Sequence, residues 1–235
     1  PTHPLHNQTA LEIRYMTAKD EDILTSRSLL KAGLAVDRML DNVIVDKRVQ
    51  VDDLLIGDKT ALIVAARRTG YGDDYETNVT CPVCARSSDY SFDISEPPAS
   101  DFRTAMQEYE VEQTKNGTFL ITLPMTQGRV ECRFMTGADE REMFKEAERK
   151  MKKKIDASST TDLFRRYIVS INGEDNPLSI QGYVQAMPAR DARALRRIYS
   201  EIIPKLEMTQ HFVCDNCEYE ADMEVPLGSD FLWPE

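Results

Sequence analysis

Two Cys-x-x-Cys pairs, Cys81 with Cys84 and Cys214 with Cys217, constrain this 235-residue chain more than any other feature. A spacing of two residues lets both thiolates of a tight turn face one ion, and two such turns supply the four ligands of a tetrahedral Zn²⁺ site. Alternating residues at 75–80 and 208–213 predict strands that enter the pairs, and 90–94 and 218–225 predict strands that leave them. The pattern predicts two β-hairpins that face each other across one structural Zn²⁺, as in a zinc ribbon.

The two pairs are separated by 129 residues, whereas self-contained ribbons place about 15–20 residues between their pairs. The middle of the chain is therefore expected to be an insertion, and Pro97-Pro98 and Pro204 mark its ends. The predicted domains are an N-terminal strand and helical region (1–72), a discontinuous zinc-ribbon-like module (73–96 with 206–227), an inserted α+β domain (97–205) and an aromatic C-terminal tail (228–235).

Other roles for the cysteines are weaker. A thioredoxin-like redox pair needs a thiol at a helix start, but a strand pattern follows each pair here. Disulfides or plain buried thiols stay open as alternatives. His211 lies three residues before Cys214 and is a possible ligand. Four cysteines already satisfy zinc, so His211 is interpreted instead as a half-buried strand residue. Cys132 is interpreted as a buried strand residue.

Hydrophobic periodicity predicts an α+β chain. Strand-like residues 11–15 precede Thr17, which is expected to cap a helix with Asp20 and Glu21 in its first turn, and the region up to residue 69 is mainly helical. Segments 109–112, 119–123 and 129–134 predict a three-stranded meander, and helices are expected from Gly137 onward. No repeat at solenoid periods is found. The only repetition is the strand, Cys-x-x-Cys, strand unit.

Charge and hydropathy exclude several classes of partner. The 40 acidic and 29 basic residues give a net charge of −11, which repels phosphate backbones and argues against nucleic-acid binding. No apolar run approaches the roughly 20 residues of a membrane-spanning helix. The amino end has no cationic region followed by an apolar one, so synthesis in the cytoplasm without export is expected.

The sequence contains no recognised catalytic motif. There is no P-loop, no complete dinucleotide-binding glycine pattern, no His-Glu-x-x-His and no Gly-x-Ser-x-Gly, so neither an enzyme nor a small-molecule substrate is predicted. A site with four cysteine ligands has no open position for water or substrate. The run Lys150, Lys152, Lys153, Lys154 is interpreted as a solvated helix end, with a binding patch as the alternative.

The carboxyl end carries Phe231, Leu232 and the only tryptophan, Trp233, after Gly228-Ser229. So short a tail offers more apolar surface than it can bury alone. It either folds back onto its own ribbon or anchors in a partner, and the three side chains are the candidate partner-binding residues.

The order of several short motifs resembles the baseplate (hub) protein family of contractile-tailed bacteriophages, or myoviruses. The resemblance rests on four segments spread over residues 11–235: Met16–Glu21, Arg67–Gly72 running into the first cysteine pair, Met187–Asp191, and the second cysteine pair with Phe231–Pro234. The meander at residues 109–134 has no counterpart.

This resemblance implies a non-enzymatic structural component of the tail baseplate, in its hub region, which is made in the host cytoplasm and located in the virion. It implies contacts with other baseplate or tail proteins in multiple copies, without nucleic acid or membrane. Two alternatives stay open: an assembly factor or chaperone absent from the finished virion, and a generic zinc-ribbon module that binds protein or nucleic acid. Hub versus wedge position and copy number do not follow from the sequence.

Overall fold

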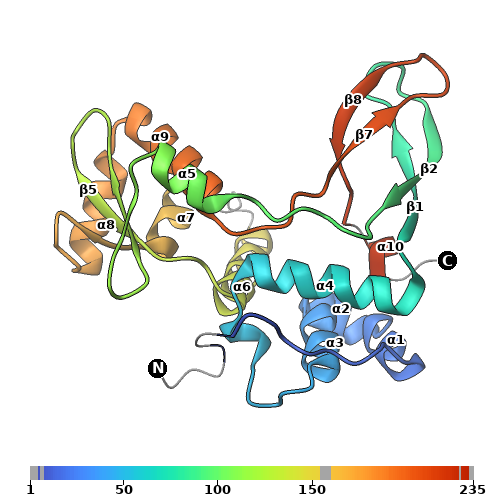
Figure 1. Ribbon diagram of the computed structural model, residues 1–235. Coiled ribbons are helices and arrows are strands. Elements are labelled where there is room, and N and C mark those ends of the chain that lie inside the picture. Colours follow the sequence, from blue (N-terminus) through green and yellow to red (C-terminus); the bar gives the residue numbers. More distant parts are fainter. Residues whose placement is uncertain (1–4, 6–7, 154–159, 228, 233–235) are drawn as a thin grey trace. The chain divides into compact units, whose positions relative to one another are not determined.

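The computed structural model describes residues 5, 8–153, 160–227 and 229–232 (Figure 1). The chain divides into two compact units. The first contains residues 1–51, 58–99 and 205–235, and the second contains residues 52–57 and 100–204. Helices and small antiparallel sheets occur in both units, so the predicted α+β class is confirmed.

The first unit begins with short helices around a small apolar core. Met39, Leu40 and Val43 on one face of α3 are completely buried, and Ile44 continues this core just after the helix. The bounds of the helices in this unit are α1 (Ala18–Leu24), α2 (Arg27–Ala32), α3 (Ala35–Val43), the 3-10 turn η1 (Val51–Asp53) at the unit boundary, α4 (Ile56–Tyr71) and α10 (Ser229–Leu232).

Two β-hairpins complete the first unit, and Figure 1 shows them side by side. Strand β1 (Asp74–Thr80) pairs antiparallel with β2 (Ser87–Asp93), and β7 (Thr209–Val213) pairs with β8 (Glu220–Glu224). Alternation places Tyr75, Phe92 and Phe212 on buried faces, while the carboxylates of the strands point to solvent. The zinc-ribbon-like module therefore has an aromatic interior and an acidic exterior.

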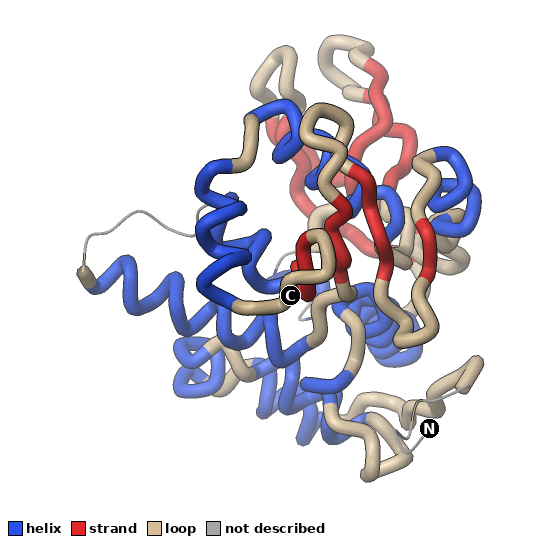
Figure 2. The backbone as a smooth tube through the Cα atoms, turned by 90° about the vertical axis from the view of Figure 1, so that its left-hand side faces the viewer, coloured by secondary structure: helices blue, strands red, loops and turns tan. Residues whose placement is uncertain are grey.

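The second unit contains a four-stranded antiparallel sheet in the order β3-β4-β5-β6, and helices α5 to α9 belong to its described residues. Figure 2 draws all strands of the chain red and all helices blue. The core of the second unit joins sheet residues such as Ile121 and Val130 to Leu195 and Ile202 on α9. The bounds are α5 (Phe102–Glu108), β3 (Glu112–Gln113), β4 (Phe119–Thr122), β5 (Arg129–Cys132), α6 (Gly137–Lys152), α7 (Thr160–Tyr167), β6 (Ile168–Ile171), α8 (Pro177–Ala186) and α9 (Ala189–Ile202).

The expected meander differs at its first strand. Residues 109–112 were predicted as a strand, but α5 continues to Glu108, Tyr109 caps it, and only Glu112 and Gln113 pair with β4. Glu110 has a positive φ of 51°, which ends the helix and redirects the chain. The alternating residues 109–112 therefore form the end of the helix and the connection to β3, and only Glu112 belongs to the strand.

The chain leaves and rejoins the first unit at neighbouring points. Ala99 and Leu206 form an isolated antiparallel bridge, and the backbone N–H of Glu207 donates to the carbonyl of Pro98 at 2.7 Å. These residues lie beside the prolines that marked the expected insertion. The segment between them forms most of the second unit.

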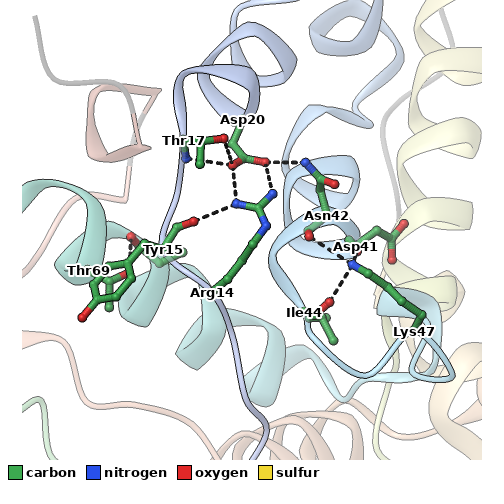
Figure 3. Close-up of polar contacts among 10 residues, drawn as sticks. Arg14, Tyr15, Thr17, Asp20, Asp41, Asn42, Ile44, Lys47 and Thr69 are labelled. Atoms are coloured by element: carbon green, nitrogen blue, oxygen red, sulfur yellow. Dashed lines mark hydrogen bonds and ion pairs between the residues drawn. The ribbon is translucent and has the colours of Figure 1, made fainter.

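A buried carboxylate organises the start of the first unit (Figure 3). Arg14 donates both guanidinium ends to Asp20, at 2.7 and 2.9 Å, and one end also reaches the carbonyl of Tyr15. The Thr17 backbone N–H and hydroxyl donate to the same carboxylate at 2.8 and 2.9 Å, and Asn42 of α3 donates at 2.6 Å. We call Arg14, Thr17 and Asp20 the first clasp; it fixes the start of α1 and joins it to α3.

The second unit contains the same arrangement. Arg133 donates to both oxygens of Asp139 at 2.7 Å and to the carbonyl of Phe134 at 3.1 Å. The backbone N–H and hydroxyl of Thr136 donate to Asp139 at 2.8 and 3.2 Å. Arg133, Thr136 and Asp139 form the second clasp, which sets the start of α6.

The repeated geometry has a repeated sequence behind it. Residues 11–21 read LEIRYMTAKDE and residues 130–140 read VECRFMTGADE, with six identical positions of eleven. Each arginine also donates its backbone N–H to the last residue of a helix, Arg14 to Val43 at 2.9 Å and Arg133 to Tyr167 at 2.8 Å. The strand, Cys-x-x-Cys, strand unit is therefore not the only repetition in the chain, and this second one has no solenoid period because it occurs once, 119 residues apart.

Candidate metal centre

The four paired cysteines lie together at the tips of the two hairpins. The turn after β1 carries Cys81 and Cys84, and the turn after β7 carries Cys214 and Cys217. Cys81 and Cys214, the first of each pair, are buried, while Cys84 is half-buried and Cys217 is exposed. Two segments 129 residues apart in sequence therefore converge on one point, as the spacing predicted.

The two turns have the same backbone hydrogen bonds. In the first, the N–H of Cys81 donates to the carbonyl of Arg86 at 2.9 Å, and the N–H of Ala85 donates back to Cys81 at 3.0 Å. In the second, the N–H of Cys214 donates to the carbonyl of Tyr219, and the N–H of Glu218 donates to the carbonyl of Cys214, both at 2.9 Å. Each turn is thus closed from both sides, which holds its two cysteines in place.

Each turn places the residue after its second cysteine in the left-handed region. Ala85 and Glu218 both have a φ of 55°, a conformation that favours glycine. Neither residue signals such a turn by its type, so the sequence did not reveal it. The matching values show that the two Cys-x-x-Cys turns share one backbone conformation although different residue types follow their second cysteines.

Sulfur distances match a tetrahedral metal site. Cys81 Sγ lies 3.7 Å from Cys217 Sγ, Cys84 Sγ lies 3.8 Å from Cys214 Sγ, and the four sulfurs all lie within 4.8 Å of one another. A tetrahedron with Zn–S bonds of about 2.3 Å has edges of about 3.8 Å. A disulfide would hold its sulfurs at about 2.05 Å, and none of these cysteines forms one.

Electrostatics favour a cation among the sulfurs. The backbone N–H of Arg86 and the side chain of Asn216 lower the pKa of Cys84 to about 6. The backbone N–H of Tyr219 acts in the same direction on Cys217, but desolvation and the neighbouring sulfurs outweigh it and raise that pKa to about 12. Four thiolates this close repel one another, so full ionisation of the cluster requires a bound positive ion.

Contacts outside the sulfur cluster align the two hairpins. Arg86 donates to the Asn216 side-chain oxygen at 2.8 Å, directly between the two cysteine turns. The hydroxyl of Tyr90 donates to the carbonyl of His211 at 2.9 Å, and the Tyr90 ring packs 5.2 Å from that of Phe212. The hairpins therefore have a polar and aromatic interface of their own that brings the cysteine pairs together.

His211 and Cys132 do not join the cluster. The His211 side chain is 60% exposed on β7 and faces Glu220 and Asp222, so it is not the half-buried strand residue that the sequence favoured. Cys132 is fully buried on β5 in the second unit, and burial raises the pKa of its thiol far above the usual range. The interpretation of Cys132 as a buried strand residue is confirmed.

The donor set fits zinc in a structural role. Four cysteine sulfurs at tetrahedral spacing fill the coordination of Zn²⁺ and leave no position for water or substrate. Among the described residues, no other group of histidine, cysteine and carboxylate side chains is arranged to hold a metal ion. The arrangement can cross-link two hairpins, and it offers no chemistry to a substrate.

The aromatic tail lies against the first unit. Phe231 and Leu232 are 1% and 7% exposed on the short helix α10, and the Phe231 ring meets that of Tyr75 on β1 edge-on at 4.9 Å. Of the two arrangements left open by the sequence, these two side chains adopt the self-packed one, so neither offers free surface to a partner. Trp233 lies outside the described residues, and a partner contact of the tail stays a prediction.

Replacing Phe231 with alanine is expected to lower the melting temperature of the first unit by more than about 5 °C. Loss of a buried phenylalanine typically costs about 3–5 kcal/mol, and each kcal/mol shifts melting by about 2–4 °C in a chain of this size. Leu227→Ala is the control, since Leu227 is 43% exposed and should change melting little. Equal melting of both variants, measured by calorimetry, would show that Phe231 is not packed in solution.

The fold and the site define an α+β protein whose two distant hairpins share a four-cysteine centre of zinc-ribbon type. A family model described as "T4 bacteriophage base plate protein" matches residues 3–233, which is nearly the whole chain. The chain belongs to this family of phage baseplate proteins. No curated protein and no solved structure matches it. No helix in the described part of the chain is long and apolar enough to cross a membrane.

Proposed function

We propose that this chain is a non-enzymatic structural component of the tail baseplate of a contractile-tailed phage, located in the hub region of the virion. The observation that carries the proposal is the family match, which spans both units and the cysteine centre together. A match of this extent concerns the whole architecture and not the ribbon alone. This favours a baseplate role over a generic zinc-ribbon module.

The cysteine centre supports the structural part of the proposal. Zn²⁺ held by Cys81, Cys84, Cys214 and Cys217 cross-links the segments on either side of the second unit. Such a cross-link stabilises the folded chain without taking part in a reaction. The protein then works through contacts with other baseplate and tail proteins in multiple copies, and with no nucleic acid, membrane or small-molecule substrate.

Mass spectrometry of purified virions and of isolated baseplates tests the location. We expect the protein in both preparations, at a fixed ratio to other baseplate proteins and in more than one copy per tail. Presence in assembling baseplates but absence from finished virions would replace the structural role with that of an assembly factor. Absence from both, together with salt-dependent binding to DNA or RNA, would favour the generic zinc-ribbon module.

A further inference from the structure

Helix α9 presents a cationic face to solvent. Leu195, Ile198 and Ile202 anchor its opposite side in the core of the second unit. The outward side carries four exposed arginines at a spacing that gathers them on one face of the helix: Arg190, Arg193, Arg196 and Arg197. We call these four residues the arginine face. The guanidinium of Arg197 lies 5.4 Å from the Tyr109 ring centroid, which helps to orient it.

The arginine face lacks the ion pairs that other charged helices of this unit make. Arg166 of α7 binds Glu142 and Glu146 of α6 at 2.9 and 2.7 Å, and Lys150 of α6 binds Asp162. Within the described part of the chain, none of the four arginines forms an ion pair with a carboxylate. Helix α9 has two acidic residues. Asp191 is fully buried and accepts hydrogen bonds from the Met125 and Thr126 amides, and Glu201 is exposed one turn after Arg197 but forms no ion pair with it.

The chain itself contains a surface of opposite charge. Residues 73–96 and 206–227, the zinc-ribbon-like module, hold twelve acidic residues and one arginine, a net charge of −11. This equals the net charge of the whole chain, so the positive and negative charges of the remaining residues cancel. On β8 the side chains of Glu220 and Asp222 are 63% and 79% exposed, and Glu224 follows on the same face.

We propose that the arginine face of one copy of this chain binds the acidic outer face of the zinc-ribbon-like module in a second copy. Both surfaces are exposed and opposite in charge, and like patches repel, so the contact joins unlike surfaces head to tail. Repetition of such a contact gives a ring or a chain of copies. A nucleic-acid partner for the arginines is disfavoured because the chain as a whole carries a net charge of −11, which repels a phosphate backbone.

This inference deepens the proposed function by naming one partner, and the two can fail separately. A chain that is monomeric when purified but present in baseplates would overturn the inference and leave the proposed function standing. A chain that self-associates through these surfaces but is absent from virions and baseplates would do the reverse.

The test is the mass of the full-length, zinc-loaded protein in solution, measured by analytical ultracentrifugation over a range of concentrations and salt. We expect multimers at low ionic strength and dissociation at about 0.5 M salt, because screening shortens the reach of charges to a few ångströms. A monomer under all conditions, or multimers that salt does not affect, would overturn the proposal.

Charge reversal identifies the surfaces. The double variants R190E/R193E and E220K/E224K should each weaken association by at least about tenfold. The matched control K115E/K145E reverses two exposed lysines elsewhere in the second unit and should associate as the unaltered chain does. Mixing the two charge-reversed variants restores opposite charges across the contact, so hetero-association should return. Equal weakening by the control, or no recovery in the mixture, would overturn the proposal.

Discussion

Replacing Cys84 or Cys214 with serine should reduce bound zinc from about one ion per chain to almost none and should unfold the zinc-ribbon-like module. Serine keeps the size of the side chain but supplies no thiolate, so only three ligands would remain. Structural zinc sites contribute about 10–16 kcal/mol of apparent binding free energy at neutral pH, which is as large as the whole free energy of unfolding of most domains. Metal analysis and amide exchange of β1, β2, β7 and β8 measure the two effects.

The loss should be confined to one unit. The second unit has its own core around Ile121, Val130 and Leu195, and none of the four cysteines lies in it. Amides of β4 and β5 should therefore stay protected from exchange in both serine variants. General loss of protection in both units would show that the cysteine centre stabilises the whole chain.

Cys132→Ser is the matched control because Cys132 is also a reduced, buried cysteine. A hydroxyl at this apolar position should lower stability modestly but leave zinc content unchanged. Two results would contradict the zinc proposal: a folded, purified chain that contains no zinc, and a Cys84→Ser variant that retains a full equivalent. Disulfides between Cys81 and Cys84 under reducing conditions would also contradict it.

The cysteine centre was predictable because its signal is carried by residue type and spacing. Cys-x-x-Cys turns between strands have few other uses in a reducing environment, so the pairing of two segments 129 residues apart followed from the sequence. The contacts that align the hairpins were not predictable. Arg86 and Asn216 are common surface residue types, and only the fold shows that they face each other.

The aromatic tail illustrates a different limit. The sequence predicted that Phe231 and Leu232 would be buried, but two hydrophobic side chains do not specify the surface against which they pack. Burial of Phe231 against Tyr75 depends on β1 and α10 being neighbours, a long-range contact that local patterns cannot supply. Apolar patterning predicts that a residue is buried and leaves its partner to the fold.

The clasps could have been found from the sequence, but only in part. Thr17 was expected to cap a helix, and Asp20 was expected in its first turn. The missing element was Arg14, which lies three residues before the Thr17 cap and adds an ion pair from its partly exposed guanidinium to the buried Asp20 of the capping box. The signal was the recurrence of the same arginine, threonine and aspartate at residues 133, 136 and 139.

Substituting Asp20 with alanine is expected to destabilise the first unit by about 2–4 kcal/mol. Removal of one partner from a buried pair costs roughly 3–5 kcal/mol, and the 37% exposure of the Arg14 side chain reduces that figure because water can reach the guanidinium. The Thr17 cap and the Asn42 bond to α3 are lost at the same time. Chemical denaturation measures the change, and Asp22→Ala, at an exposed position of the same helix, is the control.

Acid titration separates the contribution of the Asp20 charge to the stability of the first clasp from the contribution of its hydrogen-bond geometry. Burial raises the pKa of Asp20, but hydrogen bonds from Arg14, Thr17 and Asn42 outweigh it and hold that pKa well below its usual range. The folded pKa thus lies below the unfolded value of about 3.9, so the clasp stabilises the fold above that pH and loses this contribution as the pH falls. Asp20→Asn should lose stability at neutral pH yet show a flatter decline below about pH 4. If the free energy of unfolding falls equally steeply with pH in Asp20→Asn and in the unaltered chain, other carboxylates control acid unfolding. The first clasp would then stabilise the fold through its hydrogen bonds and packing, without a contribution from the Asp20 charge.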